Sequence, residues 1–151
     1  MTSPRRRLLA VLLVGLLPWT VVVLQDGASL VFSFGLVNTG PFNVVHLYDY
    51  LFVYTAGLPR RLEAWPLGVV LHAGALACAV GSIWGYEDPR LTAGLLFLAG
   101  IAHAQVAYGL YQVYGSAGPL VIPLGALATW VVVWWYYWPL VKEQGLVARA
   151  G

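Results

Sequence analysis

The chain has 151 residues, of which 60% are hydrophobic and only 9% are charged. Since a soluble domain usually carries about 25% charged residues, this composition excludes a water-exposed globule and indicates that much of the surface faces lipid. The formal net charge of +2 is too small for a nucleic-acid-binding surface. The positive residues lie at the ends of apolar segments, as topology signals do.

Asp, Glu, Lys and Arg are absent from three stretches, residues 8–24, 64–86 and 91–141. A helix needs roughly 17–25 apolar residues to cross a hydrocarbon core about 30 Å thick, so each stretch is long enough for at least one span. We therefore predict an all-α membrane helical bundle, formed by residues 1–151 as a single integral membrane domain. The four predicted spans are residues 8–24, 65–86, 91–114 and 120–138.

The first predicted span follows three arginines and resembles the start of a signal peptide. No small-residue cleavage site follows, because Asp26 occupies the candidate −3 position. We interpret the segment as an uncleaved span that Pro18 kinks or ends early. Residues 28–37 form either a short extended hairpin over the membrane surface or a broken continuation of this span, and their periodicity does not decide between them.

Residues 42–56 are predicted to form a short helix that begins after Pro41 and ends at Gly57. Fifteen residues cover roughly 22 Å, so the helix is expected at the membrane interface or in a re-entrant position. His46 and Asp49 lie one turn apart on it and are candidates for an ion or proton path. The alternative, which the short length favours, places Asp49 in water beside tyrosines that anchor the helix.

The turn Glu87-Asp88-Pro89-Arg90 separates the second and third predicted spans. Asp88 is expected to cap the following helix, with Pro89 at its first position. The fourth predicted span ends in an aromatic belt, which is typical of a membrane interface. The candidate lipid contacts are Trp134, Trp135 and Trp138 in this belt, together with Arg60 and Arg61 before the second span.

The distribution of Lys and Arg predicts the orientation of the bundle. With four spans and a cytoplasmic N-terminus, the cytoplasm holds Arg5, Arg6, Arg7, Arg90, Lys142 and Arg149. The outside then holds only Arg60 and Arg61, a split of six to two. If residues 42–56 also cross, the split is five to three, so the rule prefers four spans without deciding. We predict a cell-membrane protein with both termini in the cytoplasm.

Two histidines in the second and third predicted spans, His72 and His103, are flanked by small residues that let helices approach closely. Both are therefore expected to face protein, at depths that differ by roughly 6 Å, or about one turn. Facing histidines at similar depth are what bis-His ligation of haem b requires. The alternative, which we favour, is a pair of interhelical hydrogen bonds. No Cys/His spacing for a metal site exists.

Gln105, Tyr108 and Gln112 form a polar stripe on the third predicted span. These side chains either line a path through the membrane or join neighbouring spans by hydrogen bonds, and the second role is the more common one.

Residues 49–68 (DYLFVYTAGLPRRLEAWPLG) and 134–140 (WWYYWPL) resemble a family of small, uncharacterised multi-pass membrane proteins of halophilic archaea. The similarity in the order of features extends over most of the chain. The resemblance implies no activity, cofactor or catalytic residue.

The sequence contains no GxGxxG, P-loop, HExxH or GxSxG motif, and no paired carboxylates inside the predicted spans. We therefore predict that the protein is not an enzyme and has no catalytic or metal-binding residues. The first hypothesis is a structural or accessory subunit whose partners are the lipid bilayer and other membrane subunits or further copies of the chain. The second is a small transporter or channel for an ion or proton. The third is an electron-transfer subunit that holds haem or a quinone.

Overall fold

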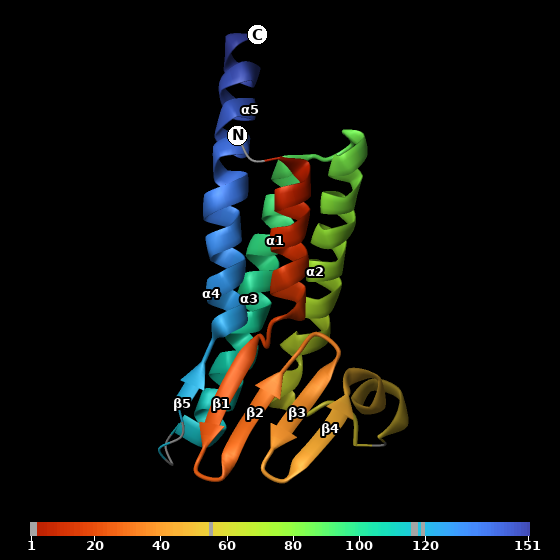
Figure 1. The fold of residues 1–151 in the computed structure, drawn as a ribbon, viewed down its shortest axis with the longest axis vertical. Helices are drawn as coiled ribbons and strands as arrows, with labels where there is room; N and C mark the ends of the chain where they lie inside the picture. The colour runs from red at the N-terminus through yellow and green to blue at the C-terminus, as the bar shows by residue number, and fades with distance from the viewer. Residues whose placement is uncertain (1–2, 55, 116–117, 119) are drawn as a thin grey trace.

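The computed structural model describes residues 3–54, 56–115, 118 and 120–151. Helices run side by side as a bundle, and a five-stranded antiparallel sheet lies at one end of it (Figure 1). Both chain termini lie at the opposite end, which we call the terminal end (Figure 1). The helices are α1 (Pro4–Leu16), α2 (Ala64–Gly81), α3 (Pro89–Tyr114), α4 (Leu124–Val132) and α5 (Trp138–Ala150). The short 3₁₀ and π segments are η1 (Asp49–Val53), η2 (Arg60–Leu62), η3 (Ser82–Trp84) and η5 (Val133–Tyr137).

The sheet makes the all-α prediction wrong. Its strands are β1 (Thr20–Leu24), β2 (Gly27–Val31), β3 (Gly35–Thr39), β4 (Phe42–His46) and β5 (Leu120–Ile122). They are arranged in the order β4-β3-β2-β1-β5, with antiparallel neighbours throughout. Of the two alternatives for residues 28–37, the extended hairpin is therefore the correct one. The edge strands β4 and β5 come from chain segments more than 70 residues apart.

The first predicted span, residues 8–24, is wrong because the chain leaves the helix at Leu17. Leu17 is extended, with ψ 151°, and Pro18 follows it. The next residues, Thr20–Leu24, are one threonine, three valines and a leucine, which suit a strand better than a helix. Hydropathy alone does not distinguish a buried strand from a continued helix, so the two elements were merged in the prediction.

The predicted short helix over residues 42–56 is also wrong. Its first third is strand β4, which pairs with β3 from Thr39↔Phe42 to Gly35↔His46 around a turn at Gly40-Pro41. The signal that suggested a helix start was Pro41, which here belongs to a hairpin turn. Helical structure begins only after β4 and includes one π turn, η1.

Three helical stretches among the described residues are long and apolar enough to cross a membrane: Arg60–Trp84, Pro89–Tyr114 and Leu124–Ala150. The prediction of four spanning helices is therefore wrong. Helix α1 has only 13 residues, although it packs beside α2 in the bundle. The fourth predicted span, 120–138, begins as β5, and its helix starts at Leu124 and continues through η5 into α5.

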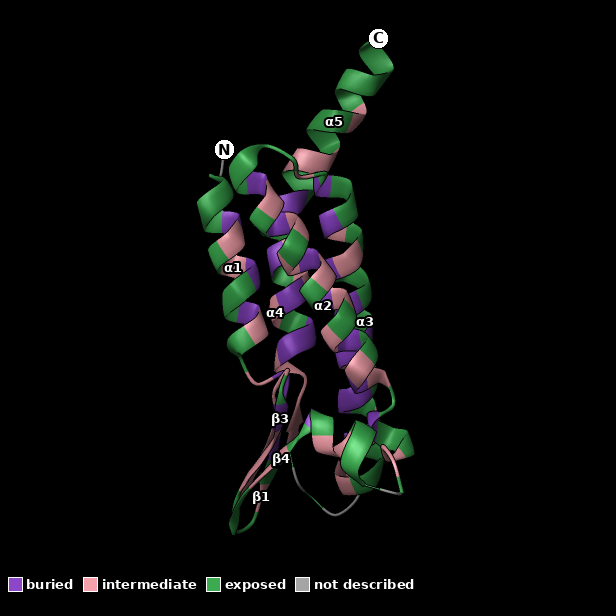
Figure 2. Ribbon diagram, turned by 90° about the vertical axis from the view of Figure 1, so that its right-hand side faces the viewer, coloured by how far each residue is buried: buried purple, intermediate pink, exposed green. Residues whose placement is uncertain are grey.

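Two clusters of buried apolar side chains hold the molecule together. In the bundle, buried residues lie on the sides of the helices that face one another (Figure 2). The cluster nearer the sheet combines Trp19, Val22 and Val31 with Trp65 and Val106 of the helices. The sheet and the bundle therefore share one core. The second cluster fills the bundle towards the terminal end with Val11, Val14, Ala75, Ala79, Leu96, Val132 and Tyr137.

Trp19 forms the joint between the two parts of the fold. Its backbone N–H donates to the carbonyl of Val31 (2.7 Å), and its carbonyl accepts from the N–H of Gly125 (2.7 Å). Its indole Nε1–H donates to the Val14 carbonyl (2.8 Å). A side chain at position 125 would collide with the Trp19 backbone, since a Cβ there would lie 2.7 Å from the Trp19 Cα. Glycine at this position therefore lets α4 start directly against the sheet.

The terminal end is closed by a buried ion pair. The Arg7 guanidinium of α1 donates to the Glu87 carboxylate at 2.9 Å, and the two side chains are only 10% and 4% exposed. The Thr92 hydroxyl donates to the other Glu87 oxygen at 3.0 Å. The predicted cap is present, because Asp88 Oδ1 accepts from the N–H of Arg90 at 2.9 Å and Pro89 opens α3. This end of the molecule is therefore fixed by polar contacts between α1 and the α2–α3 turn.

Candidate functional site

The two candidate histidines, His72 and His103, lie together inside the bundle. His72 of α2 is 4% exposed, His103 of α3 is 1% exposed, and their ring centroids are 6.2 Å apart. Trp19 packs against both rings, with its centroid 3.9 Å from His103 and 5.6 Å from His72. The structure thus places both histidines against protein, at the level where the sheet joins the helices.

Glycines make this close approach possible. A Cβ at Gly68 would lie 2.9 Å from His103 Nδ1, and a Cβ at Gly15 would lie 3.0 Å from His72 Nε2. Each histidine ring therefore packs against a glycine of a neighbouring helix, where any larger residue would collide with the ring. The small residues around His72 and His103 in the sequence were the signal for this packing.

The hydrogen bonding of the pair is incomplete. His72 Nε2 lies 2.9 Å from the Val11 carbonyl oxygen, so this nitrogen carries the proton and donates. His72 Nδ1 and His103 Nε2 are buried and have no partner among the described residues. Bis-His haem ligation needs room for the porphyrin between the two rings. The Trp19 indole packs against both rings instead, which leaves no such space. Of the two interhelical hydrogen bonds in the alternative, the described residues form the one from His72 to Val11.

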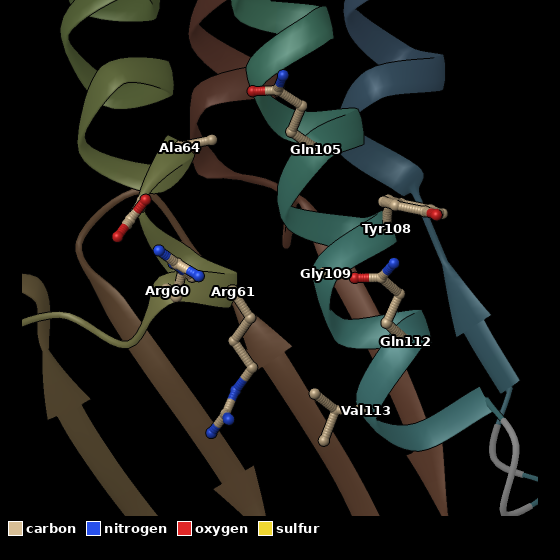
Figure 3. A pocket seen from close by; sticks show the side chains of 9 residues that line it. Arg60, Arg61, Ala64, Gln105, Tyr108, Gly109, Gln112 and Val113 are labelled. Atoms are coloured by element: carbon tan, nitrogen blue, oxygen red, sulfur yellow. The ribbon is translucent and has the colours of Figure 1, made fainter.

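A polar groove lies at the sheet end, between η2 and the C-terminal part of α3 (Figure 3). Its volume is about 510 Å³. It is lined by Arg60, Arg61, Glu63, Ala64, Gln105, Tyr108, Gly109, Gln112 and Val113. The groove brings together two sets of residues that the sequence analysis treated separately, the predicted polar stripe of α3 and the two arginines before α2. Their proximity was missed because more than 40 residues separate them along the chain.

The two arginines are held at the groove by their neighbours. Leu62, which follows them, is 2% exposed and packs in the core cluster nearer the sheet, so η2 is fixed to the protein. The backbone of η2 lies directly on α3 at Gly109, where a Cβ would be 2.6 Å from the Arg61 carbonyl oxygen. Both arginine side chains are exposed, and neither forms a salt bridge within the part of the chain that the structure describes. Their charge is therefore available to a ligand.

The predicted path residues His46 and Asp49 lie elsewhere. His46 is exposed at the end of β4, and Asp49 is half-buried at the start of η1. Neither lines the polar groove. The pair does not share a helix face, because His46 belongs to a strand. Beside them Tyr50 packs edge-on against Trp65, with centroids 6.1 Å apart, and burial raises the pKa of its phenol.

The aromatic belt occupies the outer face of the third long helix. Trp134, Trp135 and Trp138 are 65%, 62% and 48% exposed, and their contact with lipid stays a prediction. Trp134 and Trp138 also line a shallow apolar groove with Phe97, Trp130 and Val133. The belt coincides with the π segment η5, where the helix is locally widened.

The fold is a helical bundle with a sheet at one end, and it combines three long apolar helices with a polar groove at the sheet end. These features do not identify a reaction. The chain belongs to the family of DUF8050, a domain of unknown function, whose sequence profile matches residues 1–146. No curated protein and no solved structure matches the chain. The match confirms the predicted membership of an uncharacterised family. The predicted source in halophilic archaea stays a prediction.

Proposed function

We propose that the protein is an integral protein of the cell membrane and acts as a structural or accessory subunit. The three long apolar helices cross the bilayer, with α1 packed beside them. Six of the eight Lys and Arg residues belong to the terminal end, and only Arg60 and Arg61 belong to the sheet end. The positive-inside rule therefore places both termini in the cytoplasm and the sheet outside.

The observation that carries the accessory role is a group of exposed aromatic side chains in β4 and in the segment that follows it. Strand β4 ends the sheet on one side, and η1 lies beside it (Figure 1). Large aromatic side chains of this region are exposed: Phe42 by 77%, Tyr48 by 65% and Phe52 by 72%. We call Tyr48 and Phe52, whose ring centroids are 5.0 Å apart, the η1 patch. Exposed aromatic side chains that lie close together are typical of a surface that binds another protein.

The packed interior of the bundle supports the same role. Apolar side chains, among them Val11, Ala75 and Leu96, fill the space between the histidine pair and the terminal end. The Arg7–Glu87 ion pair lies at that end. Packed side chains therefore fill this part of the bundle in a single chain, which suits a structural subunit better than a channel.

Native membranes provide the direct test. The tagged chain is extracted in a mild detergent, and the proteins that co-purify are identified by mass spectrometry and sized. We expect a stoichiometric partner, or a homo-oligomer, that is lost in a Tyr48→Asp variant. Tyr86→Asp is the matched control, because Tyr86 is 88% exposed at the terminal end. A lone chain, or equal loss in both variants, would contradict the proposal.

Transport of an ion or proton is the second candidate, and the polar groove is the observation that favours it. Gln105, Tyr108 and Gln112 line this groove as the stripe suggested. Asp49 and His46 lie outside it, so a path would have to be completed by another subunit. Flux into reconstituted vesicles that Asp49→Asn abolishes would support transport. The third candidate, electron transfer through haem at His72 and His103, requires a Soret band in the purified protein.

A further inference from the structure

We propose that the polar groove is a binding site for a phospholipid with an anionic head group, held by Arg60 and Arg61. The lipid's hydrocarbon chain enters a second, apolar pocket that adjoins the groove at Tyr108. The proposal rests on the membrane position of the long helices, but not on the accessory role of the chain.

The polar half of the site matches a phosphodiester. Arg60 and Arg61 are adjacent in the chain, but their exposed side chains point in different directions (Figure 3). Each guanidinium group offers several N–H donors, which bind phosphate oxygens with charge-assisted hydrogen bonds. Gln105 and Gln112 add side-chain amides from the same side of α3, two turns apart (Figure 3). Arg60 and Arg61 have no salt-bridge partner among the described residues, so a phosphate would not have to displace an internal carboxylate.

Glu63 refines the choice of head group. Its carboxylate also lines the groove and leaves the side chains there with a formal charge of about +1, which suits one phosphodiester. Its carboxylate can accept a hydrogen bond from a head-group hydroxyl, and the net positive charge of the lining favours a lipid of net negative charge over a zwitterionic one. Phosphatidylglycerol has this chemistry, whereas phosphatidylcholine does not.

The apolar half of the site is a pocket of about 280 Å³ on the other side of Tyr108. It is lined by Ala104, Ala107, Tyr108, Tyr111, Val121 and Pro123. The two alanines are about one turn apart on α3 and leave a furrow between larger side chains. Tyr108 lines both pockets, so a ligand that filled them would have a charged part and an apolar part. Free phosphate would use only the polar half.

The depth of the site is that of lipid head groups. Arg60 begins one of the long apolar helices, and Tyr114 ends another. Helix α3 has 26 residues and is about 39 Å long, which exceeds a hydrocarbon core of about 30 Å. Its last turns therefore extend into the head-group layer, where Gln112 and the arginines meet phosphate. Ala104 lies two turns closer to the hydrocarbon, where an acyl chain belongs.

Native mass spectrometry of the purified full chain in detergent tests this site. The protein is titrated separately with phosphatidylglycerol, phosphatidylcholine and inorganic phosphate. The key variant is Arg60→Gln/Arg61→Gln, and the matched control is Arg5→Gln/Arg6→Gln, an adjacent exposed pair at the terminal end. We expect the affinity for phosphatidylglycerol to fall by about tenfold or more in the first variant and to stay within about twofold in the control.

The apolar half is tested with Ala104→Leu, which fills the pocket, against Ala77→Leu, which adds the same side chain on an exposed face of α2. Of these two variants, we expect only Ala104→Leu to weaken binding of phosphatidylglycerol. Gln112→Leu, in the polar groove, should also weaken binding although the apolar pocket is unchanged. Equal binding of phosphatidylcholine, or equal losses in the two arginine pairs, would overturn the proposal. If inorganic phosphate displaces phosphatidylglycerol and Ala104→Leu has no effect, the groove binds free anions, and the proposal of a lipid site is overturned. None of these results depends on a protein partner, so the accessory role can fail while the lipid site stands.

Discussion

The two ends of the bundle use arginine in opposite ways. At the terminal end Arg7 forms a buried ion pair with Glu87, and the pair joins α1 to the α2–α3 turn. At the sheet end Arg60 and Arg61 are exposed beside a groove of about 510 Å³. The difference follows from the neighbours: a buried carboxylate faces the first arginine, whereas amides, a tyrosine and an exposed carboxylate face the other two. One end holds the fold together, and the other is the site that we propose binds lipid.

The largest effect on stability is expected from removing the buried ion pair at the terminal end. Glu87→Ala leaves the Arg7 guanidinium buried without its carboxylate, which costs about 3–5 kcal/mol of the free energy of unfolding. Glu63→Ala, at the sheet end, removes an exposed carboxylate and should change stability by no more than about 0.5 kcal/mol. Thermal unfolding of both variants in the same detergent measures the difference. Similar midpoints would mean that the Arg7–Glu87 contact does not hold the terminal end.

An intermediate effect is expected where η2 rests on α3. Gly109→Ala places a Cβ against the Arg61 carbonyl, so the backbone must shift, at a cost of about 1–3 kcal/mol. The same shift moves Arg61 in the groove and should weaken binding of phosphatidylglycerol. Gly94→Ala on the same helix meets nothing within 4 Å and should be neutral or stabilising by about 0.5–1 kcal/mol. If the two alanines have equal effects, η2 is not fixed by this contact.

The smallest effect separates the two buried histidines. His72→Phe removes the hydrogen bond to the Val11 carbonyl and should cost about 1 kcal/mol more than His103→Phe, whose Nε2 has no partner among the described residues. Phenylalanine keeps a ring against Trp19 at both positions. Unfolding midpoints under identical conditions give the order, and a greater loss for His103→Phe would show that its Nε2 has an important partner.

The sequence predicted the parts of the fold that depend on local signals. The second and third predicted spans match α2 with η3 and α3 closely, because charged or turn residues mark their ends. The Asp88 cap with Pro89 is a signal over two adjacent residues, and it is present. The interior position of His72 followed from the small residues beside it.

The sheet could not be predicted in the same way. Strand β1 follows α1 without a charged residue between them, so both were assigned to one apolar segment. Its neighbour β5 is about 100 residues away, and such pairings leave no trace in local hydropathy. The groove was missed for the same reason, although each of its polar residues except Glu63 was a candidate. Only the fold brings Arg61 onto Gly109.

The most direct test of the account is the orientation of the two ends across the membrane. Cys78 is replaced by alanine, and single cysteines are introduced as Gln25→Cys, at the tip of the β1–β2 turn, and Gln144→Cys, in α5; both glutamines are exposed. Intact cells are treated with a membrane-impermeant maleimide. We expect position 25 to be labelled in intact cells and position 144 only after lysis. Labelling of both positions from the same side would contradict a bundle that holds its sheet outside the cell and its termini within.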